Sequence, residues 1–153
     1  MKEAPISDTN IEVLNDVTKM LIDSQKGYEK AAEIVEDSHA FSTELTRRAA
    51  DRATLVGAFQ AEVRTLGGEP DTEGGLLGKA HRGFTDFASK FQDNRKAAFD
   101  AIDDGEDYLA DRIEDKLEKD GLSQGTRDLL ARAHGAAKEG ERIADRMEDS
   151  LDD

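Results

Sequence analysis

The sequence predicts an all-α protein, an antiparallel bundle of four long helices, and three observations lead to that class. Apolar residues recur with the period of about 3.6 residues that is typical of amphipathic helices. Only two prolines, Pro5 and Pro70, occur in 153 residues, so long helices meet few breaks. Short clusters of Gly, Ser and Asp separate the periodic stretches. The length fits a single domain over residues 1–153, with flexible ends expected at about 1–7 and 149–153.

The first two periodic stretches predict a helical hairpin with a very short loop. We expect the first helix from about residue 8 to 36, capped by a side chain among residues 7–9. Its inward positions fall seven residues apart, at Leu14, Leu21, Tyr28 and Val35. Asp37 and Ser38 break this helix and cap the second, which is expected to end at Gly67.

The segment that follows predicts a crossover between two hairpins. Residues 67–75 combine glycines with Pro70 and have the composition of a loop. Beyond them, apolar residues from Leu76 to Phe91 outline a short amphipathic helix. Its three phenylalanines, Phe84, Phe87 and Phe91, are expected to pack on the bundle; the alternative is an exposed face that binds a partner.

The second half predicts another hairpin. A third helix is expected over about residues 93–119 and is ended by Gly121. Its predicted inward residues are Ala98, Ile102, Gly105, Leu109, Ile113 and Leu117. Ser123 is expected to cap a fourth helix, whose heptad positions extend from Leu130 to Leu151 and are rich in alanine and glycine.

The charge balance limits the classes of partner. Acidic residues number 35 against 21 basic ones, for a net charge of −14, which repels nucleic acid and anionic lipid and favours cationic partners, including metal ions. No cysteine is present, so disulfides and thiolate chemistry are excluded. No apolar run approaches the roughly 20 residues that span a bilayer, and we expect a cytoplasmic protein without membrane insertion.

Three stretches carry a family resemblance: IEVLNDVTKMLIDSQKGYEKAAE from Ile11, FQAEVRTLGGEP from Phe59, and GGLLGKAHRGF from Gly74. Together they resemble a bacterial ferritin-like four-helix-bundle family known mainly as a domain of unknown function. The resemblance covers roughly the first 110 residues. It implies a ferritin-like bundle with up-down-down-up helices and a long crossover, in which the short amphipathic helix predicted above would lie between the second and third helices, and it implies little about activity.

A ferritin-like fold raises the question of a di-iron centre, which takes a Glu from each of two helices and a Glu-x-x-His from each of the others. Counting from the resemblance, the second-helix motif would fall at Asp51 and Thr54, so threonine stands where histidine is needed. In the fourth helix, His134 follows Ala131 instead of an acid. The di-iron motif is therefore incomplete.

Charged residues on the inner face of the second helix allow two interpretations. The first is a structural ion pair in the bundle core, in which Arg52 is neutralised by Asp51 or Glu106. The second is an unusual carboxylate site for iron or another divalent metal. The ligands it would use are Glu29, Asp51, Glu106 and Glu141, with His134 nearby.

These patterns favour a non-catalytic helical bundle that works by association with a protein partner or with a second copy, in stress physiology or near the cell envelope. No catalytic residue is predicted, because the serines lack a nucleophile-elbow motif and the histidines lack partners, and no cofactor is expected. The alternative is a metal-binding, iron-handling ferritin-like protein.

Overall fold

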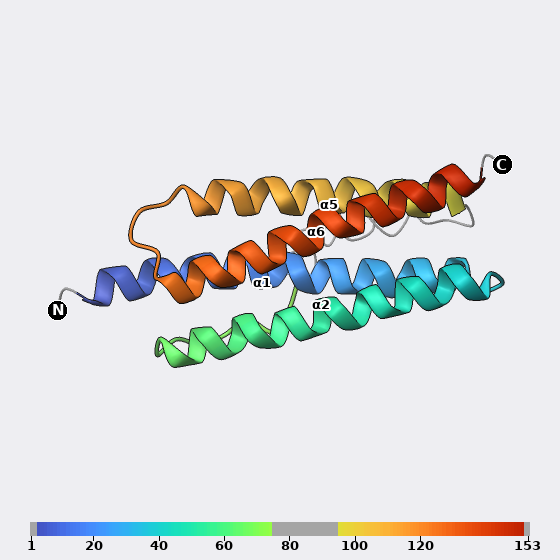
Figure 1. Cartoon of the computed structure of the whole chain (residues 1–153). Helices are drawn as coiled ribbons and strands as arrows, with labels where there is room; N and C mark the ends of the chain where they lie inside the picture. Colours follow the sequence, from blue (N-terminus) through green and yellow to red (C-terminus); the bar gives the residue numbers. More distant parts are fainter. Residues whose placement is uncertain (1–2, 75–94, 152–153) are drawn as a thin grey trace.

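The computed structural model describes residues 3–74 and 95–151, with side chains from residue 8 onward, and four helices account for most of them. The helices are α1 (Glu3–Ile34), α2 (His39–Thr65), α5 (Arg95–Leu117) and α6 (Gln124–Leu151). They pack lengthwise as a bundle (Figure 1), and no strand occurs within these residues. The prediction of an all-α four-helix bundle is therefore confirmed. The predicted crossover helix lies outside the described residues.

The helices form two hairpins. α1 packs mainly on α2 and α5 mainly on α6, and the hairpins meet chiefly along α1 and α5. α1 and α6 run in one direction, whereas α2 and α5 run in the other (Figure 1). An ion pair of 2.5 Å between Arg95 and Asp37 ties the start of α5 to the turn between α1 and α2. At the opposite end, Lys116 lies 3.0 Å from Asp16.

Helix ends differ in part from the sequence prediction. α1 begins at Glu3, so residues 7–9 lie inside the helix and do not cap it. Ser38 is the N-cap of α2, with extended backbone, but its side chain makes no capping hydrogen bond. Gly67 and Gly121 adopt φ of +89° and +84°, the left-handed conformation that glycine tolerates after a helix.

The loop between α5 and α6 is fixed by side-chain hydrogen bonds. The Ser123 Oγ accepts from the Thr126 N–H at 3.1 Å, which confirms the predicted N-cap of α6. The buried Asn10 side chain on α1 donates to the Gly121 carbonyl at 3.0 Å and accepts from the Ser123 N–H at 2.9 Å. These contacts hold the second hairpin at a defined position along the first.

Two apolar clusters make up the core, one in each half of the bundle. The first contains residues such as Val13, Leu21, Leu55, Phe59, Ile113 and Leu130. The second contains residues such as Ala31, Val35, Leu45, Phe99, Ile143 and Met147. Between them lies a layer of polar side chains. Gly105, which was expected to face inward, is exposed, and its neighbour Glu106 takes the buried position.

Candidate functional site

A buried arginine is the centre of the polar layer. Arg52 on α2 has none of its side chain exposed. Its guanidinium forms an ion pair with the Oε2 of Glu106 on α5, and also donates to the Ala136 carbonyl on α6 at 3.1 Å. Its Nε donates to the Ser24 Oγ on α1 at 3.0 Å. All four helices thus contribute an atom to this network, and burial of the arginine is compensated by an opposite charge.

Tyr28 on α1 completes the network. Its hydroxyl donates to the Glu106 Oε2 at 2.5 Å, and the guanidinium carbon of Arg52 lies 5.3 Å from its ring centroid. Buried tyrosines usually find a partner for the hydroxyl, and here that partner is the same oxygen that faces Arg52. We refer to Tyr28, Arg52 and Glu106 as the central triad.

Gly140 on α6 makes room for the central triad. A Cβ at this position would lie 2.8 Å from the Glu106 Cδ and would also collide with the Tyr28 hydroxyl. The glycine therefore has a packing role, because it lets α6 approach the carboxyl group closely. The alanine- and glycine-rich pattern of α6 predicted that another helix would pack closely against it, but it did not predict that the Glu106 carboxyl group would lie there.

Burial sets the protonation behaviour of the triad. It raises the pKa of Glu106 above the ordinary value, while the charge of Arg52 and the hydrogen bond from Tyr28 hold back part of the rise. Burial and the neighbouring Glu106 charge raise the pKa of Tyr28 well above its ordinary value. The phenol therefore stays protonated and acts as a hydrogen-bond donor.

The structure separates the members of the predicted ion pair. Arg52 and Glu106 meet, but Asp51 does not join them: its side chain is 52% exposed and lies 3.6 Å from Arg48 on the outside of the bundle. Neighbouring residues of a helix point about 100° apart, so a side chain next to a buried arginine is turned away from the core.

The predicted carboxylate ligands do not gather at one point. Glu29 is exposed and accepts from Gln25 at 3.2 Å. Glu141 pairs with Lys138 at 3.1 Å, and His134 lies 2.7 Å from Glu114, in the half of the bundle nearer the α5–α6 loop.

Thr54, which replaces the expected histidine, is exposed and bonds the Ala50 carbonyl at 3.2 Å. Of the predicted acids only Glu106 is buried, and its Oε2 faces a guanidinium. The residues present therefore do not fit a di-iron centre.

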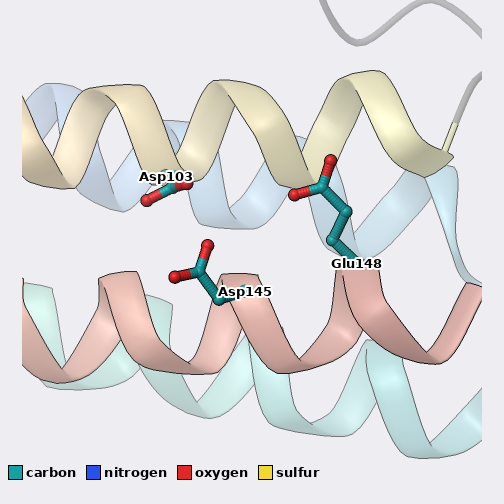
Figure 2. Close-up of side chains that lie close together, drawn as sticks. All are labelled: Asp103, Asp145 and Glu148. Carbon is teal, nitrogen blue, oxygen red and sulfur yellow. The ribbon is translucent and has the colours of Figure 1, made fainter.

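A group of acids missed by the sequence prediction lies on the seam between α5 and α6. Asp103, Asp145 and Glu148 each offer a carboxylate oxygen within 4.8 Å of the others. Figure 2 shows Asp103 on α5 facing Asp145 on α6, with Glu148 reaching toward α5 from the next turn. Within the described residues this is the group closest to a set of metal ligands. The spacing of Asp145 and Glu148, three apart on one helix face, was the available signal.

Protons and lysine offset the charge of this acidic group. Partial burial, together with the hydrogen bond and charge of Asp145, raises the pKa of Asp103 to about 7. Hydrogen bonds from Asp100 and Lys96 lower the pKa of Glu148, and the Lys96 Nζ lies 2.6 Å from its Oε2. Near neutral pH, a proton shared by Asp103 and Asp145 reduces the repulsion between the two carboxylates. A metal ion is therefore not needed to offset that repulsion.

The fold and the central triad define a class: an acidic four-helix domain whose core carries a neutralised arginine–glutamate pair. None of the helices in residues 3–74 and 95–151 is long and apolar enough to cross a membrane. The three phenylalanines that were expected to pack on the bundle, or alternatively to bind a partner (84, 87 and 91), lie outside the described residues.

Comparison with known families goes one step further. The family described as Domain of unknown function (DUF2383) matches residues 9–119, and the chain belongs to that family. The matched region contains α1 from residue 9 onward together with α2 and α5, and therefore every side chain of the central triad. Searches of curated proteins and of solved structures found no match.

Proposed function

We propose that this chain is a non-catalytic, ferritin-like helical bundle that acts by associating with another protein or with a second copy of itself. The observation that carries the non-catalytic, metal-free part of the proposal is the central triad. A guanidinium from α2 lies at the middle of the bundle and pairs with the only buried carboxylate among the predicted metal ligands. A cation fixed in that place competes with iron for the same oxygen.

The up-down-down-up direction of the helices supports the ferritin-like part of the proposal. Burial of the helix faces, at about 25 cal/mol per Å² of apolar surface, accounts for folding without a cofactor. The alternative, metal binding at the bundle centre, loses support because Glu29 and Asp51 are exposed and Glu141 pairs with Lys138 at 3.1 Å.

Two measurements test the proposal. In the first, the chain is incubated with ferrous iron, exposed to oxygen and desalted, and its iron content is then determined. We expect no oxidation signal and far less than one iron per chain. Stoichiometric iron would contradict the proposal, and an Asp103→Asn variant would show whether that iron is held by the α5–α6 acids instead of the bundle centre.

The second measurement is size-exclusion chromatography with light scattering at two concentrations, followed by affinity capture with the purified chain. We expect either a mass that increases with concentration or one protein that is captured reproducibly in near-equal amount. A strict monomer that captures nothing would overturn the association part of the proposal.

A further inference from the structure

A cleft of about 270 Å³ lies between α1 and α5, beside the central triad. Apolar side chains, including Met20, Ile102 and Leu109, form most of its wall. Pockets for drug-sized ligands and cofactors usually measure about 300–1,000 Å³, so this cleft suits a smaller molecule.

Glycines on both helices open the cleft. Gly27 on α1 and Gly105 on α5 lie in its wall. A Cβ at Gly105 would have no heavy atom within 4 Å, so helix packing does not require a glycine there. Glycine is the least favourable helix residue apart from proline, and two of them facing one space leave room that larger residues would fill.

The cleft reaches a buried polar group. Glu106 lies in its wall and is only 2% exposed. Tyr28 and Arg52 both bind the Oε2 atom. The Glu106 Oε1 atom and the Arg52 Nη1 atom are buried and have no hydrogen-bond partner among the residues that the structure describes, and of the two residues only Glu106 lines the cleft. A buried acceptor without a donor is unfavourable, and a ligand that donates a hydrogen bond there would remove the cost.

The charges around the cleft select the sign of the ligand. Its ionisable wall residues are the acids Asp23, Asp104 and Glu106 and two tyrosines, and no lysine or arginine is among the described residues that line it. Arg52 approaches Glu106 from α2, which does not line the cleft. Acidic groups and aromatic rings both attract an organic cation.

We propose that this cleft binds a small amphiphilic organic cation, with an ammonium group that donates to the Glu106 Oε1 and an apolar body packed against Met20, Ile102 and Leu109. This binding site goes beyond the proposed function and does not depend on it. A chain that associates with no partner can still bind the cation, and a chain that binds no cation can still associate.

The probe is n-octylammonium chloride, titrated into the full-length chain at neutral pH by isothermal titration calorimetry. Octanol, used below its solubility limit, and octyl sulfate, used below its micelle concentration, have the same apolar body without the positive charge. We expect saturable binding of one ammonium ion per chain, and binding of both comparison compounds weaker by about tenfold or more, as loss of a charge-assisted hydrogen bond implies. Shortening the alkyl chain should weaken binding about fourfold per methylene.

A pair of matched variants locates the site. Gly105→Leu adds a side chain inside the cleft, whereas Gly135→Leu makes the same change on α6, where a Cβ also has no heavy atom within 4 Å. Both replace a helical glycine with a good helix former, so both should fold at least as stably as the wild type. We expect Gly105→Leu to weaken octylammonium binding by more than about tenfold and Gly135→Leu to leave it unchanged.

Three results would overturn the proposal. The first is the absence of saturable binding to the wild-type chain. The second is octyl sulfate binding as tightly as octylammonium. The third is unchanged octylammonium binding by Gly105→Leu, verified as folded by circular dichroism.

Discussion

Removing the charge of Arg52 should be among the most damaging single changes in this chain. In Arg52→Met the apolar body of the side chain is largely kept, but the ion pair with Glu106 and the hydrogen bonds to the Ser24 hydroxyl and the Ala136 carbonyl are lost. Each hydrogen bond that a charged group makes contributes about 1.5–3 kcal/mol. Tyr28 still donates to Glu106 in the variant, so we expect a loss near the roughly 3–5 kcal/mol that follows removal of one partner of a buried ion pair.

Urea unfolding followed by circular dichroism measures this loss, and the double variant Arg52→Met/Glu106→Met is its control. Without both charges no ionised side chain remains buried among the described residues, so the double variant should regain at least half of the lost stability. In the single variant the pKa of Glu106 rises further, and an acid with a raised folded-state pKa stabilises the fold at low pH and loses that contribution as pH rises. The loss in free energy of unfolding caused by Arg52→Met should therefore be smaller at pH 5 than at pH 8. A single-variant loss below about 1 kcal/mol, or a double variant less stable than both single variants, would refute this reasoning.

Three further changes test separate parts of the structure. Gly140→Ala should destabilise the fold because its Cβ collides with the central triad. Gly135→Ala has open space around its Cβ and should increase the free energy of unfolding by up to about 1 kcal/mol. Thermal unfolding of the two variants measures the difference. Because the folded-state pKa of Asp103 is raised from 3.8 to about 7, its contribution is present near pH 4 and lost as pH rises through 7. Asp103→Asn should therefore raise the melting temperature at pH 8 and leave it nearly unchanged at pH 4, and an equal gain at both would contradict that assignment. Ser123→Ala should cost about 1 kcal/mol in urea unfolding, whereas Ser38→Ala, whose side chain makes no capping bond, should cost much less.

The repeat of apolar residues was enough to predict the helices, because long amphipathic stripes have few alternative structures. The same repeat could not decide which of two neighbouring residues on one helix face is buried. Gly105 and Glu106 lie three and four residues after Ile102, and both spacings fit a helix face. Counting favoured the glycine as inward, but the buried residue is the glutamate, because a partner on another helix neutralises it.

Contacts between helices were the part that the sequence could not fully predict. Arg52 and Glu106 were both candidates for the core pair, but so was Asp51, and only the direction of each side chain separates them. Whether the acids of the α5–α6 seam come together depends on how far α6 is shifted along α5. The residue pattern of a single helix does not predict that shift. The packing role of Gly140 could not be predicted either, because it depends on the side chains of α1 and α5 that face this position.

The position of the ion pair between two apolar clusters also determines how the hairpins align along the bundle axis. A slide of one heptad, about 10.5 Å, would still match apolar stripe to apolar stripe. It would also carry the Arg52 guanidinium away from Glu106 and leave each charge facing hydrocarbon. The buried ion pair therefore favours one axial alignment of the two hairpins and destabilises the heptad-shifted alignments that the apolar residues alone would allow.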